Sequence, residues 1–251
     1  MSALLVVDVQ NDFISGSLAI VNCPAGEKGE EVVEPINKMI DTVKFNEVAY
    51  SLDWHPANHI SFADNVTLRK LDESSPIKDP AQTKVMDKVV FAGPPVQEQV
   101  LWPRHCVQET WGAELHKDLK VLPNSLTIKK GIDADVDSYS AFFDNQKGNQ
   151  AKLEEQLRSR GVTDCFLAGI ATDVCVNATA LHSLEVGFRT ILVNDACRGV
   201  EAGAIEQTRQ NIRERKGVVV DTSEVEAMVQ GHDRRVELGH SLALSCRKSI
   251  S

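Results

Sequence analysis

Short and almost entirely apolar runs alternate along the chain with amphipathic segments. The apolar runs predict strands at residues 4–9, 48–52, 126–128, 165–170, 189–193 and 218–220. Apolar side chains at helical spacing predict helices at residues 30–44, 152–160, 174–185 and 202–215, and a last short helix whose capping box is Ser223 with Glu226. Near-continuous apolar strands that alternate with helices are typical of a parallel sheet covered on both faces. The sequence therefore predicts an α/β fold of three layers, α-β-α, with a mostly parallel central sheet.

No linker, repeat or low-complexity stretch divides the chain, so we expect a single domain over residues 1–251. Residues 64–101 are polar, rich in Pro, Asp and Lys, and only weakly periodic, which indicates a long insertion into that domain. The tail after Gly231 is polar apart from residues 242–244, and we predict no element there.

Composition narrows the class of protein further. Of the 251 residues, 42% are apolar and 25% are charged, and the formal net charge is -9. An acidic chain without a basic cluster is a poor candidate for binding nucleic acid or an anionic membrane surface. No apolar run approaches the roughly 20 residues of a membrane span, and the N-terminus has no basic stretch typical of a signal peptide. We expect a cytoplasmic protein, with the nucleus left open.

Polar residues with useful chemistry follow several of the predicted strands. Asp8 ends the first strand, Asp53 and His55 end the second, Lys130 ends the third, and Cys175 opens the helix after the fourth. In open parallel sheets, ligands bind outside the carboxyl ends of the strands. The pattern therefore gathers an acid, a base, a thiol and metal-type ligands along one edge.

Cys175 is the most informative of these residues. The run 169–175 is a tight strand-to-helix turn with Thr172 or Asp173 as its N-cap, which places the sulfur in the first turn of the helix. Free backbone N–H groups there lower the pKa of a thiol and favour thiolate. The alternative is that Cys175 is a small buried apolar residue, as most free cysteines are. We assign this structural role to Cys165, which lies in the middle of a strand.

The other polar residues are ambiguous taken singly. A strand-end Asp8 can cap a loop, but near a thiol it can accept and return a proton. Lys130 can be solvated with Lys129, or it can stabilise a thiolate and a developing oxyanion.

Asp53 and His55 offer two metal-type ligands on one side of a strand, and His105 can supply a third. The place of His59 stays open, because Pro56 argues against a helical pair with His55. No GxGxxG, GKT or HExxH stretch occurs, which disfavours dinucleotide, P-loop and zincin chemistry.

Five motifs in order make a more specific pattern than any single one. They are DVQNDF at 8–13, DWHPANH at 53–59, WPRHC at 102–106, KG at 130–131 followed by YSAF at 139–142, and GIATDVC at 169–175. With them the chain resembles the isochorismatase-like cysteine hydrolases, and among these the nicotinamidases. The resemblance covers roughly residues 3–222.

The resemblance implies a role for each matching residue. A catalytic triad falls on Cys175, Asp8 and Lys130, the lysine directly before the glycine. An oxyanion hole falls on the backbone N–H groups of Ala171 and Cys175, beside a cis peptide bond between Ile170 and Ala171. The metal ligands are Asp53, His55 and His105, with His59 undecided. Residues that enclose the pyridine ring of the substrate are Phe13, Trp102 and Tyr139.

The implied activity is hydrolysis of nicotinamide to nicotinate and ammonia through a Cys175 thioester, which feeds NAD salvage. The implied cofactor is a divalent metal ion, with zinc favoured and iron or manganese also compatible with one Asp and two His ligands. The sequence leaves open the oligomeric state, a homo-oligomer included.

Three alternatives compete with this interpretation. A different small-molecule amidase of the same superfamily shares the triad but lacks the metal ligands. Isochorismate hydrolysis does not need the cysteine. A binding protein without activity has no need of Asp8, Lys130 and Cys175 together.

Overall fold

A computed structural model of the protein defines residues 1–148, 152–233 and 235–239. The strands are β1 (Ser2–Val7), β2 (Glu47–Asp53), β3 (Lys88–Phe91), β4 (Gln97–Val100), β5 (Leu126–Lys130), β6 (Asp164–Ile170), β7 (Arg189–Arg198) and β8 (Val218–Val220). The α-helices are α1 (Asn11–Ile14), α2 (Val33–Thr42), α3 (Leu153–Ser159), α4 (Asn177–Glu185), α5 (Ala202–Glu214) and α6 (Thr222–Val229). Short 3-10 helices lie at Ile20–Asn22, Gly29–Val32, Ala63–Leu68, Pro80–Gln82 and Trp111–Ala113, and a π-helical turn at Thr172–Val176 leads into α4. Over these ranges, no helix combines the length and the apolar character needed to cross a membrane.

Six strands form one sheet in the order β5-β2-β1-β6-β7-β8, and every pair in it is parallel. From β1 the chain first builds outward through β2 to β5, and it later returns beside β1 to build β6, β7 and β8 on the other side. The strand order therefore reverses between β1 and β6. In such sheets, the crevice outside the carboxyl ends at the reversal point is where ligands bind. The predicted fold class is confirmed.

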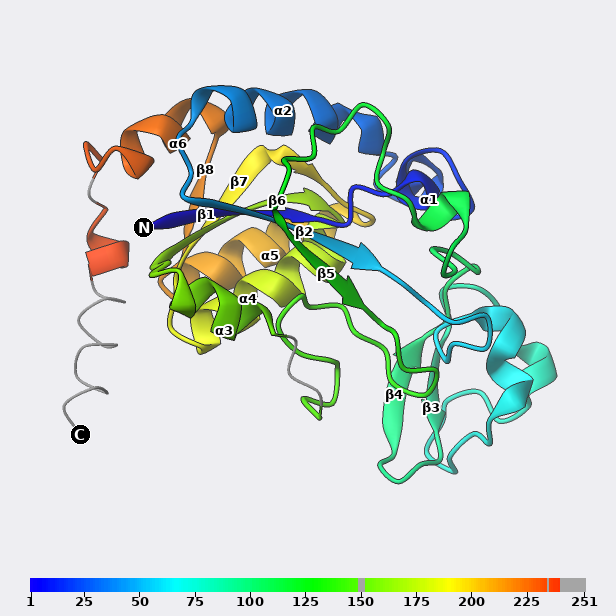
Figure 1. Cartoon of the computed structure of the whole chain (residues 1–251). Helices are drawn as coiled ribbons and strands as arrows, with labels where there is room; N and C mark the ends of the chain where they lie inside the picture. The colour runs from blue at the N-terminus through cyan, green and yellow to red at the C-terminus, as the bar shows by residue number, and fades with distance from the viewer. Residues whose placement is uncertain (149–151, 234, 240–251) are drawn as a thin grey trace, which may run out of the picture.

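Helices cover both faces of the sheet, with α2 and α6 on one side and α3, α4 and α5 on the other (Figure 1). Each face has its own apolar cluster. Leu4 and Val6 of β1 point into the cluster under α2 and α6, whereas Ala3, Leu5 and Val7 point into the opposite one. Successive side chains of a strand point to opposite faces, so a strand covered on both sides has to be apolar throughout. Burial on both faces explains why the strands of the main sheet could be recognised in the sequence as nearly continuous apolar runs.

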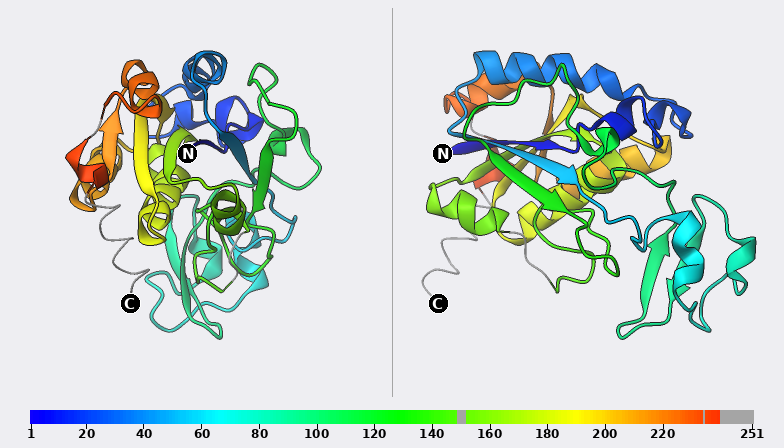
Figure 2. Two further views of the ribbon diagram at one scale, coloured as in Figure 1. Left: turned by 60° about the vertical axis from the view of Figure 1, so that its left-hand side comes forward. Right: turned by 45° about the vertical axis from the view of Figure 1, so that its right-hand side comes forward.

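The polar stretch at residues 64–101 contains two strands that the sequence did not predict. β3 and β4 pair antiparallel as a hairpin that lies apart from the main sheet (Figures 1 and 2). A separate apolar cluster belongs to this region, formed by Ile60, Val66, Leu71, Val89, Phe91 and Leu101. Each strand of the hairpin has four residues. Such short strands carry too few apolar positions for a clear alternation in the sequence.

Two predicted helix starts differ in detail from the structure. The capping box of α6 is formed by Asp221 and Glu224, so the prediction of Ser223 with Glu226 was wrong. The predicted helix 30–44 begins as a 3-10 turn and becomes α2 only at Val33. Residues 242–244 of the tail lie outside the described residues.

Gly169 of β6 sits where no side chain fits, and we expect its replacement to weaken the fold strongly. Its φ is +128°, and a Cβ added there would lie 2.1 Å from the carbonyl oxygen of Val7 on β1. Gly187 has a φ of +92° with no atom within 4 Å of such a Cβ, so Gly187→Ala isolates the backbone strain alone. We expect Gly187→Ala to lower the free energy of unfolding by about 1 kcal/mol and Gly169→Ala by about 3 kcal/mol or more, measured by urea unfolding. Equal losses in the two variants would contradict this account of the β1–β6 contact.

Candidate active site

Asp8 directly follows β1 and is fully buried. Its backbone is left-handed, with a φ of +50°, and its N–H donates to the carbonyl of Ser51. The Ser51 hydroxyl donates to Asp8 Oδ1 at 2.6 Å, and the Lys130 ammonium lies 2.8 Å from Asp8 Oδ2. Burial raises the pKa of Asp8, and the neighbouring Lys130 charge only partly offsets the effect. Asp8 is therefore more basic than an ordinary carboxylate.

Lys130 is the last residue of β5 and the register partner of Asp53 at the end of β2. Its buried Nζ contacts both carboxylates, Asp8 and Asp53, and lies 3.3 Å from Cys175 Sγ. Burial alone would lower the pKa of Lys130, but the two carboxylates outweigh it and hold the pKa well above its usual value. The neighbouring Lys129 instead points outward, with its Nζ 3.6 Å from the centroid of the Trp54 ring. Strand alternation thus separates a buried ammonium from a surface one.

Cys175 lies in the π-helical turn between β6 and α4, and its side chain is buried in the site. The peptide bond between Ile170 and Ala171 is cis, as the resemblance implied. The expectation of Thr172 or Asp173 as N-cap was wrong, because no side chain caps this turn. The Asp173 carboxylate instead accepts hydrogen bonds from the backbone N–H groups of residues 200 and 201, at 2.9 Å each. It thereby ties the turn to the loop before α5.

The pKa of the Cys175 thiol is raised, contrary to the expectation of a lowered one. Burial raises the pKa of Cys175 well above its usual value. Lys130 lowers it, whereas the nearby carboxylate of Asp8 raises it. Asp8, Asp53 and Cys175 bring their ligand atoms within 4.8 Å of one another. The thiol therefore lies near a carboxylate of raised pKa that can accept a proton.

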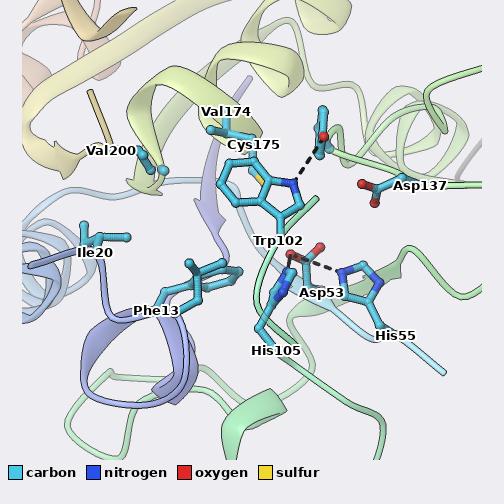
Figure 3. A pocket seen from close by; sticks show the side chains of 13 residues that line it. Phe13, Ile20, Asp53, His55, Trp102, His105, Asp137, Val174, Cys175 and Val200 are labelled. Atoms are coloured by element: carbon cyan, nitrogen blue, oxygen red, sulfur yellow. Dashed lines mark hydrogen bonds and ion pairs between the residues drawn. The ribbon is translucent and has the colours of Figure 1, made fainter. Parts of the chain in front are cut away.

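Asp53, His55 and His105 come together at the carboxyl edge of the sheet, close to Asp8 and Lys130. The Nε2 atoms of His55 and His105 lie 3.6 Å and 3.7 Å from Asp53 Oδ2 (Figure 3). Burial raises the pKa of Asp53, but the charges of Lys130 and His55 hold it well below its usual value. An ionised carboxylate between two imidazoles is a donor set that suits zinc, iron or manganese.

The backbone around these imidazoles fixes which nitrogen faces inward. His55 Nδ1 donates to the carbonyl of Gly131 at 2.9 Å, and His105 Nδ1 donates to that of Pro103 at 2.7 Å. A carbonyl can only accept, so Nδ1 carries a proton in both rings, and Nε2 is the nitrogen that faces Asp53. A Cβ at Gly131 would lie 2.3 Å from the His55 ring, so this position accommodates no side chain. The residues present therefore fit a divalent metal ion.

His59, left open by the sequence, lies beside this cluster. Its ring stacks on His55 with centroids 4.0 Å apart, and its Nδ1 lies 2.7 Å from the Ser61 hydroxyl. Its Nε2 is 4.0 Å from Asp137 Oδ1. Burial, assisted by the charge of His55, lowers the pKa of His59 to about 3. It forms a group with His55 and Asp137 and does not belong to the group of Asp53 and His105.

A small pocket opens above the sulfur and the cluster. It includes all three predicted aromatic residues, Phe13, Trp102 and Tyr139, and the Trp102 indole N–H donates to the Tyr139 hydroxyl at 3.3 Å (Figure 3). The sequence missed five further residues of the wall, which are Leu18, Ile20, Asp137, Val174 and Val200. Four are ordinary apolar side chains, and only the fold shows that they face a pocket. The wall is largely apolar and suits a small flat ring.

Two buried polar residues that support the site were also missed. The Gln10 amide accepts from the backbone N–H of Asp53 and donates to the Asp53 carbonyl, each at 2.8 Å. The Asp12 carboxylate accepts from the N–H of Cys106 at 2.7 Å, next to His105. Both belong to the motif at 8–13, so a polar run directly after a buried strand was the available signal.

Comparison with known proteins agrees with this architecture. The isochorismatase domain model matches residues 2–224. The nicotinamidase of Escherichia coli is 37% identical over 200 residues, covering 79% of this chain and 83% of its own. That of Saccharomyces cerevisiae is 31% identical over 230 residues, covering 88% of this chain and 100% of its own. The structure of a nicotinamidase from Acinetobacter baumannii superposes with a TM-score of 0.76 at 35% identity, covering 89% of this chain and 97% of its own.

Other matches carry information on ligands and on rival activities. One solved structure is the pyrazinamidase of Pyrococcus horikoshii in complex with zinc, with a TM-score of 0.63 at 30% identity and coverage of 88% of this chain and 98% of its own. Another is the yeast nicotinamidase bound to the inhibitor nicotinaldehyde, with a TM-score of 0.71 at 27% identity and coverage of 88% of this chain and 100% of its own. A ureidoacrylate amidohydrolase of Acinetobacter baylyi is 27% identical over 229 residues, covering 88% of this chain and 80% of its own. The match of the domain model over most of the chain settles the family: this chain belongs to the isochorismatase family.

Proposed function

We propose that this isochorismatase-family hydrolase is a nicotinamidase, which converts nicotinamide and water to nicotinate and ammonia and so feeds NAD salvage. The observation that carries the proposal is one juxtaposition. Cys175 lines a pocket, the buried Lys130 contacts both Cys175 and Asp8, and Asp53, His55 and His105 cluster within the same pocket. The first set suits amide hydrolysis, and the second suits recognition of a ring that carries a nitrogen.

Asp8 serves as the proton carrier of the reaction. Its raised pKa and its position within 4.8 Å of the sulfur suit it to accept the proton of Cys175. Lys130, 3.3 Å from the sulfur, stabilises the thiolate as it forms. The thiolate attacks the carboxamide carbon, and Asp8 passes its proton to the departing ammonia, which leaves a nicotinoyl thioester. Asp8 then takes a proton from water, which attacks the thioester and releases nicotinate.

The backbone after β6 supplies the oxyanion hole in this scheme. Hydrogen-bond donors placed where charge develops commonly contribute the largest share of the acceleration in acyl transfer. We assign that role to the N–H groups of Ala171 and Cys175, both in the buried turn between β6 and α4.

Asp53, His55 and His105 would hold a divalent ion, for which zinc is the favoured candidate. When bound, the ion supplies a Lewis-acid position for the pyridine nitrogen, which orients the ring against the walls formed by Phe13, Trp102 and Tyr139. The zinc-bound pyrazinamidase among the relatives supports this assignment.

The rival reading is another amidase of the family, because a ureidoacrylate amidohydrolase also matches the chain. The Asp53, His55 and His105 cluster favours nicotinamide, since a substrate without a ring nitrogen has no use for a metal in the pocket. Isochorismate hydrolysis would leave Cys175 without a role. A mere binding protein would leave the buried contact between Lys130 and the thiol without one.

Cys175→Ala should abolish ammonia release from nicotinamide, because it removes the sulfur that attacks the carboxamide in this scheme. Folding should be preserved, since a small side chain replaces another in the wall of an open pocket. Cys165→Ala is the matched control: Cys165 is fully buried in β6 and its loss should cost about 1 kcal/mol of stability while activity is retained. Ammonia assays and urea unfolding on both variants measure these effects. Substantial turnover by the Cys175 variant would refute the covalent mechanism.

Nicotinaldehyde should inhibit by adding to Cys175. The sulfur would bond to the aldehyde carbon and the thiol proton would move to the aldehyde oxygen, giving a thiohemiacetal that imitates the tetrahedral intermediate. Nicotinaldehyde is an inhibitor of the yeast relative. Inhibition constants for the wild type and Cys175→Ser, with mass spectrometry of the adduct, test this. Equal weak inhibition of both forms would count against the site.

Removal of the metal should erase discrimination between amides. Benzamide has the shape of nicotinamide without the ring nitrogen, whereas pyrazinamide keeps a nitrogen at the matching position. We expect a specificity constant for benzamide that is roughly a hundredfold lower, equivalent to ~3 kcal/mol, and pyrazinamide should remain a substrate. Ammonia release from the three amides is measured with native enzyme, with chelator-treated enzyme and with His105→Ala. Comparable rates on benzamide and nicotinamide, or full activity after verified metal removal, would exclude the metal's role.

A further inference from the structure

The β3–β4 hairpin, although its apolar core is separate, reaches the wall of the pocket through polar side chains of β4. Gln97 and Gln99 are two residues apart on this strand and so share a face. Gln97 donates to the carbonyl of Asp135 at 2.8 Å and accepts from Gln146 at 2.6 Å. Gln97 therefore docks the hairpin on the segment that follows β5, at positions outside the pocket lining.

Gln99 makes a deeper contact. Its side chain is only 3% exposed, and its Nε2 donates to Asp137 Oδ2 and to the carbonyl of Val100, at 2.8 Å each. Both partners can only accept, which determines the orientation of the amide. The same nitrogen lies 3.4 Å from the Tyr139 hydroxyl. Gln99 thus joins the hairpin to two residues of the pocket wall, Asp137 and Tyr139.

The loop that Gln99 holds has contacts to both halves of the site. Asp137 Oδ1 accepts from the backbone N–H of Ser138, and the Ser138 carbonyl accepts from Lys130 Nζ at 3.2 Å. Tyr139 accepts from the indole of Trp102, its neighbour in the pocket wall. The loop of residues 137–139 therefore contacts both the aromatic side chains of the pocket and the buried ammonium of Lys130.

We propose that Gln99 is a positioning residue for the substrate: from the hairpin it holds Asp137 and Tyr139 in the places that shape the pocket around the ring. The identity of that ring rests on the proposed function. Without the Gln99 amide, the buried Asp137 carboxylate loses a charge-assisted hydrogen bond, which is costly enough to move the side chain. Tyr139 loses its 3.4 Å contact with the same nitrogen at the same time. The insertion thereby contributes to substrate binding without touching the reacting atoms.

The test compares Gln99→Met with Gln97→Met, which removes the other glutamine of the same face of β4. Gln99→Met should raise the KM for nicotinamide roughly tenfold and change kcat by less than about twofold, because Asp8 and Asp53 still hold Lys130. Gln97→Met should leave both constants within about twofold of the wild type. Should Gln99→Met fail to fold, Gln99→Leu also removes the amide with an apolar side chain and carries the same expectation.

An unchanged KM in the Gln99 variant, or an equal rise in the Gln97 variant, would overturn the proposal, since the effect would then be absent or due to hairpin docking in general. If the wild type releases no ammonia from nicotinamide, the proposed function fails. Crystal structures of the two variants then decide on Gln99. Displacement of Asp137 and Tyr139 in the Gln99 variant alone supports the positioning role, and unmoved side chains refute it.

Discussion

The site depends on one buried charge cluster, the ammonium of Lys130 between the carboxylates of Asp8 and Asp53. Burying any of these charges alone would cost several kcal/mol, and only their mutual contact makes the burial affordable. That contact exists because three neighbouring parallel strands end at one level, with Asp53 and Lys130 in register. The cluster also joins the two halves of the chemistry. Asp8 lies beside the thiol, and Asp53 lies between the two imidazoles.

Much of this arrangement was predictable from the sequence, for a physical reason. Parallel strands are buried on both faces, so they are continuous apolar runs that can be recognised in the sequence. The polar residue that follows each run must then lie at the carboxyl edge of the sheet. Asp8, Asp53, Lys130 and Cys175 therefore met as expected. The cis bond before Ala171 was also present as the resemblance implied.

What could not be predicted depends on the three-dimensional surroundings of single residues. The pKa of Cys175 is raised by burial and by Asp8, against the lowering effect of Lys130, and none of these can be seen in the local sequence. Asp173 has the right residue type for an N-cap, but it bonds instead to a loop far along the chain. The contacts of Gln99 cross from a hairpin whose strands are too short to show alternation. Such long-range polar contacts produce no periodic pattern of residues in the sequence.

The tandem of Lys129 and Lys130 has a consequence for the fidelity of strand pairing. A slip of β5 by one residue against β2 would reverse which face each side chain occupies, so Lys129 would enter the buried position with its charge conserved. The slipped pairing would therefore satisfy both carboxylates. It would, however, replace Gly131 beside the His55 ring with Lys130. A Cβ at this position would lie only 2.3 Å from the His55 ring, which is too close. The glycine thus acts as a register check, which rejects a misaligned strand that electrostatics alone would accept.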